Sequence, residues 1–213
     1  MTIRKPHLPT ALTPANNLMA LFEDEDSLVE LRIEDQIVTG AYTKGFSMAD
    51  CAISKSDLSV MAMERFDIAN CEIKNTNLSG SKFPDSGWRT VLLDNCRCSG
   101  LQMQDSTLRN VRFANSKLDF VNFRFAKVDS MIFEDCMLDD VDFYGATLKN
   151  VEFIGCTIHK ITFDAAKMRN VDLSKSTIGK MQGIASLKGA TISYDQLIQL
   201  APYFAAEAGI KVA

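Results

Sequence analysis

Six cysteines and two histidines are the side chains of this 213-residue chain that most readily bind metals or act as nucleophiles. Cys96 and Cys98 flank a single residue, a spacing that resembles a pair of metal ligands. The other cysteines are Cys51, Cys71, Cys136 and Cys156. Because the histidines are limited to His7 and His159, the sequence argues against histidine-based catalysis and against a histidine-rich metal site.

Carboxylates and aromatic rings gather in one stretch of the sequence. Five of the carboxylates form what we call the acid band: Asp119, Glu134, Asp135, Asp139 and Asp140. Three aromatic residues lie among them, namely Phe120, Phe125 and Tyr144. Negative charge beside exposed rings can bind a protein that presents positive charge. The alternatives are a solvated surface, on which nearby lysines and arginines offset the acids, and rings that pack against the neighbouring turn of the chain.

Composition places these residues in an ordinary folded protein. The chain is 46% hydrophobic and 23% charged, which excludes a disordered polymer. No apolar run approaches the roughly 18 residues that a membrane span needs, and prolines interrupt the N-terminus where a secretory signal requires a continuous apolar stretch. We therefore expect a cytoplasmic protein without a membrane segment. A nucleic-acid binder leans basic, so the net charge of −4 predicts no direct contact with nucleic acid.

A five-residue period dominates the sequence. In steps of five from Leu28 to Ile178, 30 of 31 positions are apolar, and Thr43 is the exception. The positions two residues earlier, from Ala41 to Met181, are all apolar, serine or threonine. Two inward side chains separated by one outward residue indicate extended backbone, and the three residues that follow are rich in Asn, Asp and Gly, which favour turns. A fixed period over most of a chain indicates stacked repeats.

The stretches AKVDS, ATLKN, STLRN and NTNLSG resemble the repeat A-(D/N)-L-x-x of the pentapeptide-repeat family, and the resemblance covers roughly residues 28–192. It implies an all-β fold, a right-handed quadrilateral β-helix with four pentapeptides in each turn of 20 residues. Sorting the central positions by 20 supports four walls, because phenylalanines gather on one opposed pair and small inward residues on the other.

In such a coil, Cys51 and Cys71 stack one turn apart with parallel side chains, and so do Cys136 and Cys156. A separation of about 4.8 Å between parallel side chains is a poor disulfide geometry. We therefore expect all six cysteines to be small core residues, and we expect neither a metal site nor a cofactor.

Separate end segments should close the solenoid. We assign residues 1–27 to an N-terminal arm or cap, in which Thr13–Pro14 would begin a helix that covers the first turn; a disordered arm is the alternative. Residues 193–213 form a C-terminal helix and tail, with the helix over 194–208, Ser193 as its cap and Gly209 at its end.

The ending LKGATISYDQLIQL…AGIKV resembles that of the quinolone-resistance branch of the family, the Qnr and MfpA class. In that class the C-terminal helix and tail pair two subunits. The resemblance therefore implies a homodimer interface made of Leu197, Leu200, Tyr203, Phe204, Ile210 and Val212. The alternative is a monomer in which the same apolar stripe caps the last turn.

The same resemblance implies a non-enzymatic DNA mimic that binds a type II topoisomerase, DNA gyrase or topoisomerase IV, and modulates it or protects it from quinolones. Carboxylates of the acid band would stand in for duplex phosphates on a surface of lysines and arginines. An enzyme is disfavoured because His159 has no nucleophile partner outside the core. The alternative is a protein-interaction scaffold with another partner, because residues 101–180 hold 11 acids and 11 bases and carry no net charge.

Overall fold

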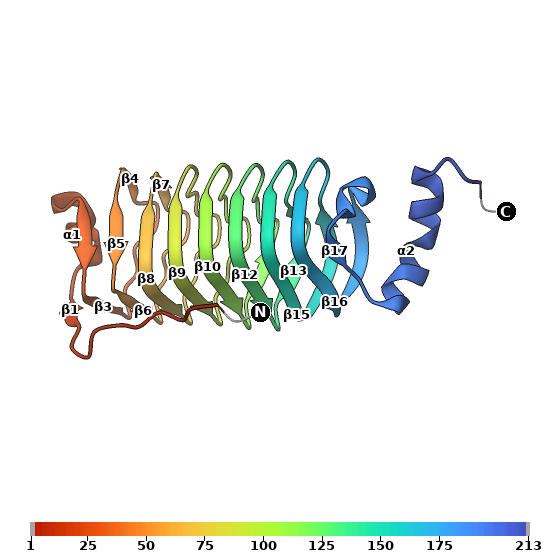
Figure 1. The fold of residues 1–213 in the computed structure, drawn as a ribbon. Coiled ribbons are helices and arrows are strands. Elements are labelled where there is room, and N and C mark those ends of the chain that lie inside the picture. The colour runs from red at the N-terminus through yellow and green to blue at the C-terminus, as the bar shows by residue number, and fades with distance from the viewer. Residues whose placement is uncertain (1–2, 212–213) are drawn as a thin grey trace.

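A computed structural model describes residues 3–211 of the chain. The chain winds into a parallel β-solenoid of about 9 turns, with a helix at either end (Figure 1). Each turn takes 20 residues, since Leu28 pairs with Met48, and Met48 in turn with Ile68. The same step still holds where Leu148 pairs with Met168. The quadrilateral β-helix with a short C-terminal helix that the sequence predicts is therefore confirmed.

Four walls make up each turn, and we number them on the turn of residues 106–125. Wall 1 is 106–109, wall 2 is 111–114, wall 3 is 116–119 and wall 4 is 121–124, with corners at 110, 115, 120 and 125. Other turns follow in steps of 20 residues.

The strands lie along these walls. Those of walls 1 and 2 are β2 (Ser27–Val29), β3 (Leu31–Glu34), β5 (Ser47–Ala49), β6 (Ala52–Ser54), β8 (Asp67–Lys74), β9 (Gly87–Asp94), β10 (Thr107–Ala114) and β12 (Lys127–Glu134). Wall 3 holds β11 (Lys117–Asp119) and β13 (Met137–Asp139), and wall 4 holds β4 (Tyr42–Lys44), β7 (Ala62–Glu64) and β14 (Val141–Asp142). The long strands β15 (Thr147–Thr162) and β16 (Lys167–Gln182) begin on wall 1 and end on wall 4.

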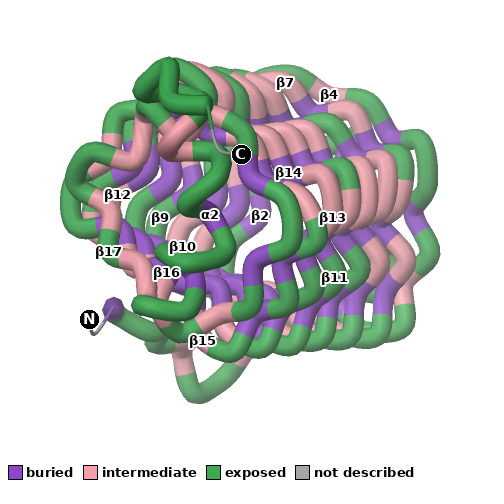
Figure 2. The backbone as a smooth tube through the Cα atoms, turned by 90° about the vertical axis from the view of Figure 1, so that its right-hand side faces the viewer, coloured by how far each residue is buried: buried purple, intermediate pink, exposed green. Residues whose placement is uncertain are grey.

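The core is a column along the axis, lined by the two inward positions of each pentapeptide (Figure 2). Of the 31 central positions, 29 are buried, and the two exceptions, Thr43 and Met168, are half-buried. Of the 29 preceding inward positions all but Ser176 are buried. Alternation of side chains across an extended backbone therefore sets the inside and the outside of the wall.

Each corner requires the left-handed backbone conformation. The corner residues Asn70, Asn110 and Asn150 have φ of 52°, 52° and 53°. Asn, Asp and Gly adopt this conformation most readily, which explains their frequency at every fifth position. Val60, Phe120 and Phe125 occupy the same conformation with bulky side chains, at φ of 60°, 55° and 58°.

Helix α1 (Leu18–Asp24) closes the N-terminal end by burying Leu18 and Phe22. Its N-cap is Asn17, whose side chain accepts a hydrogen bond from the Ala20 amide at 3.1 Å. The predicted helix start at Thr13–Pro14 is wrong, because β1 (Thr13–Ala15) instead pairs with β3 as an extra strand.

Residues 3–12 run back along the outside of the solenoid (Figure 1). The main chain of His7 exchanges two hydrogen bonds with the side chain of Asn70, at 2.8 and 2.9 Å. The arm is thereby attached to a corner of a turn three turns further along the solenoid.

At the C-terminal end the register stops after Gln182. Gly183 has a φ of 82°, and a side chain there would collide with the backbone of Asp164, so the chain can leave the wall at this point only through glycine. The 3-10 helix η1 (Ile184–Leu187) and strand β17 (Ala190–Thr191) follow.

Helix α2 (Tyr194–Glu207) then covers the last turn. Ser193 and Gln196 form a capping box, as the sequence predicts for Ser193, and Gly209 follows the helix with a φ of 73°. The Gln196 amide donates to the carbonyl oxygens of Leu173 and Ser176 at 2.8 and 2.7 Å, and the Gln199 amide donates to that of Ile178 at 2.7 Å. These amides replace the N–H groups that a further turn would supply. Within residues 3–211, neither α-helix has the length and apolarity of a membrane span.

Candidate interaction surface

The acid band divides between two edges of wall 3. Asp119 and Asp139 point outward from this wall in register on neighbouring strands, and Asp140 occupies the corner beside Asp139. Glu134 belongs to wall 2, and Asp135 occupies the corner between walls 2 and 3. The structure therefore brings Asp119, Asp139 and Asp140 together and leaves the other two acids across the width of the wall.

Basic residues offset most of this negative charge. Arg112 forms an ion pair with Glu134, Lys117 lies 3.0 Å from Asp119, and Lys160 lies 2.8 Å from Asp140. Ser99 also donates a hydrogen bond to Asp119 at 3.3 Å. Asp135 and Asp139 are the members of the acid band without an ion pair in the described part of the chain. The band is therefore a locally balanced surface with two free carboxylates.

The aromatic residues of this stretch take two different positions. Phe125 and Tyr144 meet edge to face with ring centroids 5.6 Å apart, and the Arg124 guanidinium lies 4.4 Å from the Tyr144 centroid. A side chain at Gly145 would approach the Phe125 ring to 2.6 Å, so glycine there allows the ring to pack on the next turn. Phe120 is 62% exposed and makes no ring contact among residues 3–211.

The eight predicted contact residues do not form one surface. Phe120 occupies the corner between walls 3 and 4, next to Asp140 one turn on, and so adjoins the acid band. Phe125 occupies the corner between walls 4 and 1, diagonally across the coil from Asp135. The surface that could touch one partner consists of Asp119, Phe120, Asp139 and Asp140.

All six cysteines are free and buried, as the sequence predicts. Burial raises the pKa of the Cys96 thiol to about 11 and that of Cys98 well above its usual value. A hydrogen bond with Cys51, together with burial, raises the pKa of Cys71. These thiols therefore stay protonated and unreactive at neutral pH. In the described residues no group of three or more His, Cys, Asp or Glu side chains is placed to hold a metal ion.

Some residues of the predicted dimerisation stripe of α2 face the core of their own chain, and others are exposed. Leu200 is 1% exposed and Phe204 packs on the core, so both help to cap the last turn of their own chain. Leu197, Tyr203 and Ile210 are exposed, and Val212 lies outside the described residues. Sequence reasoning missed Tyr194 and Ile198, which are 75% and 59% exposed; they do not belong to the stripe that marks the buried side of the helix.

Comparison with known proteins identifies the repeat. Residues 86–163 match the family model described as a pentapeptide repeat region. The structure extends the 20-residue register of that region on both sides, from the pairing of Leu28 with Met48 to that of Ile158 with Ile178.

Solved structures of another protein have the same fold. Two trypsin-treated variants of QnrB1, a plasmid-mediated fluoroquinolone resistance protein, superpose with a TM-score of 0.51 and 17% identity. The two alignments cover 88% and 87% of this chain, and 100% and 99% of the QnrB1 chains. At that identity the likeness shows the fold. A search of curated proteins found no match.

Proposed function

We propose that this protein is a non-enzymatic rod that acts in the cytoplasm by binding a type II topoisomerase, DNA gyrase or topoisomerase IV. It modulates the enzyme or protects it from quinolones. The observation that carries the proposal is the unbroken register of the wall, which sets the Asp119 and Asp139 carboxylates one turn apart on a rigid face. The shared fold with QnrB1, a fluoroquinolone resistance protein, supports the choice of partner.

Binding would use the free charge and the exposed ring on the edge of wall 3. A topoisomerase surface built for duplex phosphates presents lysines and arginines, which attract carboxylates held at regular spacing. Asp139 has no ion pair in residues 3–211, and Phe120 adds an exposed aromatic contact beside it. Asp140 can join once Lys160 exchanges its partner, since both side chains of this pair are partly exposed and such pairs are weak. The Asp119 side chain is only 16% exposed and contributes mainly through its charge.

A gyrase supercoiling assay, with and without ciprofloxacin, tests this proposal. We expect micromolar protein either to inhibit supercoiling or to restore it in the presence of the drug. The double charge reversal Asp139→Lys with Asp140→Lys should weaken the effect. The matched control is Asp85→Lys with Asp105→Lys, which changes the charge equally at exposed corners between walls 4 and 1. Absence of any effect from the unaltered protein contradicts the proposal.

The exposed face of α2 is our proposed homodimer interface. Its exposed large side chains are Tyr194, Leu197 and Ile198 on one side of the helix, Tyr203 on another side, and Ile210 after the helix. Such a concentration of large apolar side chains is typical of a protein contact. Leu197→Glu with Tyr203→Glu should give folded monomers in light scattering, because neither residue is buried. A change at Phe204 is a poorer test, since it would also damage the cap of the last turn.

The second candidate is a scaffold for a partner other than a topoisomerase. The ion pairs of Glu134, Asp119 and Asp140 favour it, because they leave the acid band with less free charge than a duplex mimic needs. In that case the aromatic contact at Phe120 would dominate binding. The gyrase assay separates the candidates, since a scaffold for another partner leaves supercoiling unchanged.

A further inference from the structure

Charged residues are sorted by wall along the later turns. Residues 101–180 contain 11 bases and 11 acids, yet five of these bases and one of these acids lie on wall 1. The five bases are Arg109, Lys127, Lys149, Lys167 and Arg169, and the single acid is Asp129. Arg89 extends the set by one turn toward the N-terminus. The neutral average of this stretch therefore conceals one strongly basic wall.

The bases of wall 1 are mostly unpaired. Lys149 forms an ion pair with Asp129 at 2.7 Å, whereas the five other bases of the wall have no ion-pair partner within residues 3–211. Elsewhere on the same turns most bases are paired; the paired ones are Arg112, Lys117, Arg124 and Lys160. Wall 1 therefore presents positive charge that the protein itself does not neutralise.

Four of these bases, Arg89, Arg109, Lys149 and Arg169, form a straight ladder on rigid strands, in which Asp129 occupies the middle position. Arg89 pairs in register with Arg109, and Lys149 with Arg169 (β9 with β10, β15 with β16). Four steps of about 4.8 Å separate Arg89 from Arg169, so the ladder is about 19 Å long. Five or six base pairs of a duplex, at about 3.4 Å each along its axis, span the same length.

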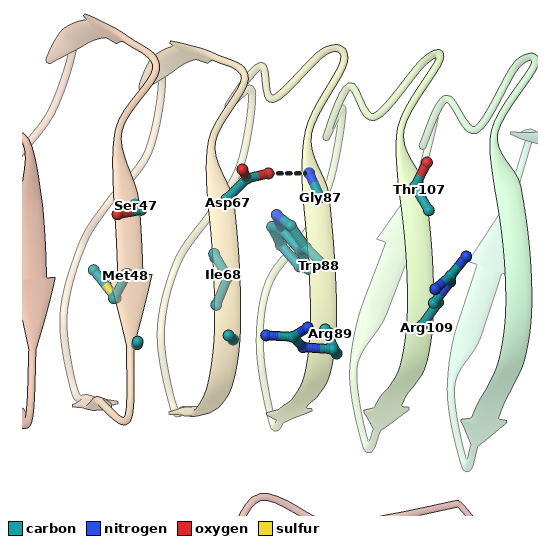
Figure 3. Close-up of a pocket in the computed structure, with 11 residues that line it drawn as sticks. Ser47, Met48, Asp67, Ile68, Gly87, Trp88, Arg89, Thr107 and Arg109 are labelled. Atoms are coloured by element: carbon teal, nitrogen blue, oxygen red, sulfur yellow. Dashed lines mark hydrogen bonds between the residues drawn. The ribbon is translucent and has the colours of Figure 1, made fainter.

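Shallow hollows lie at both ends of the ladder. The first, of 430 Å³, is bordered by Arg89, Thr107 and Arg109, which Figure 3 shows on neighbouring strands. Asp67 also lines this hollow, and its carboxylate accepts a hydrogen bond from the Gly87 amide at 2.8 Å. The second, of 530 Å³, is bordered by Lys167, Arg169 and Lys188. Basic side chains beside small residues leave room for a polyanion to approach the wall closely.

The chemistry of wall 1 distinguishes between classes of polyanion. Among residues 86–170 it has no exposed large hydrophobic side chain, whereas protein interfaces concentrate their binding energy in aromatic and apolar residues. Single strands are bound through aromatic stacking platforms, which this wall lacks as well. The corner between walls 1 and 2 carries hydroxyls and amides, including Asn110 and Asn150, which commonly contact phosphates. The corner between walls 4 and 1 instead carries Asp85, Asp105 and Phe125.

We propose that wall 1 binds the phosphate backbone of double-stranded nucleic acid without reading its sequence. The net charge of the whole chain predicts no contact with nucleic acid, because it averages over all four walls. Screening limits the influence of the other walls to about 8 Å at physiological salt, so the charge of wall 1 decides what binds there. This inference is independent of the topoisomerase proposal, which concerns walls 3 and 4.

Fluorescence anisotropy with a labelled 20-base-pair DNA duplex tests the proposal in the absence of any topoisomerase. The test variant combines Arg109→Gln, Lys167→Gln and Arg169→Gln, which are exposed and unpaired. The control combines Lys117→Gln, Lys160→Gln and Lys180→Gln, an equal charge change on wall 3 and its corner. The unaltered protein should bind with a micromolar dissociation constant at about 50 mM salt.

The test variant should bind at least about tenfold more weakly, and the slope of log affinity against log salt should become shallower by about 2 to 3. The control should stay within about threefold of the unaltered protein. Three outcomes overturn the proposal: no binding by the unaltered protein, an equal loss in both variants, or polyglutamate competing as well as duplex at equal charge. The last outcome would assign the wall to an acidic protein segment. Circular dichroism of each variant checks that the solenoid is folded.

Discussion

The early turns of the solenoid (residues 27–85) and the later turns (residues 86–182) share one register but have different cores. In the later turns Phe113, Phe133 and Phe153 stack at 5.4 and 4.8 Å between ring centroids. Phe123 and Phe143 stack likewise on the opposite wall at 4.9 Å, and rings of the two stacks meet edge to face. In the early turns methionine, isoleucine and leucine occupy most of the corresponding positions, and the rings of Phe66 and Phe83 meet tilted.

The longest strands of the solenoid lie in the later turns, where the phenylalanine rings stack. Strands β2 to β7 have three or four residues each and β8 has 8, whereas β15 and β16 of the later turns have 16; the later turns also contain the short strands β11, β13 and β14. Most central residues of the later turns are 0% exposed, although Met168 is half-buried, whereas most of those of the early turns are 1–4% exposed and Thr43 is half-buried. Identical side chains repeated at the same place in each turn pack without voids. The family match begins at residue 86, and the phenylalanine stacks begin within it, at Phe113 and Phe123. We infer that regular packing makes the later turns the more stable part.

The largest expected effect on stability comes from truncating one core side chain in the later turns and one in the early turns. Phe133→Ala removes a ring that contacts four other rings, and should lower the free energy of unfolding by about 3–5 kcal/mol. Met63→Ala, at an equally buried site of the early turns, should cost about 1 kcal/mol less, because no aromatic pairs are lost. Guanidinium unfolding followed by circular dichroism gives both values. Equal losses would show that the two cores are equivalent.

A smaller effect is expected where α2 caps the later turns. Gln196→Ala leaves the carbonyl oxygens of Leu173 and Ser176 without their donors, and should cost about 1–3 kcal/mol. Hydrogen exchange should report faster opening of β16 and little change in the early turns. The exposed neighbour Asp195→Ala is the control. Unchanged exchange in β16 would mean that the glutamine is dispensable as a cap.

Corner residues offer a gain in stability in both regions. Val60→Asn in the early turns and Phe120→Asn in the later turns each relieve a left-handed conformation that their bulky side chains disfavour. We expect the free energy of unfolding to rise by about 0.5–1 kcal/mol in each case. If Phe120 contacts a partner, its variant alone should weaken gyrase inhibition. Thermal unfolding beside the supercoiling assay separates these effects, and a loss of stability at either site would refute the strain argument.

The smallest expected difference is in the rate at which cysteines of the early and the later turns are alkylated. At pH 8 the buried cysteines react only when their turn opens, since burial keeps thiols such as Cys96 protonated. Cys71 of the early turns, whose pKa is also raised, should therefore be alkylated before Cys96 and Cys98 of the later turns. Peptide mass spectrometry after timed alkylation measures the order. The reverse order would contradict the stability difference, and full labelling in guanidinium is the control.

The sequence by itself determined the length of each turn of the solenoid, and which side chains face the core and which face the solvent. A period of five with two apolar positions, followed by Asn, Asp or Gly, leaves one backbone solution, because corners need left-handed residues and walls need alternation. That reasoning also placed the cysteines in the core and ended α2 at Gly209.

The tertiary structure decided which side chains contact one another. The ion pair of Lys160 with Asp140 joins residues 20 apart, and it depends on side chains of neighbouring turns competing for partners. The same competition leaves Arg109 and Arg169 of wall 1 unpaired, and the docking of α2 decided that Leu200 is buried while Leu197 is exposed. A local period fixes the direction of each side chain, whereas its partner depends on register and packing between turns that are distant in sequence.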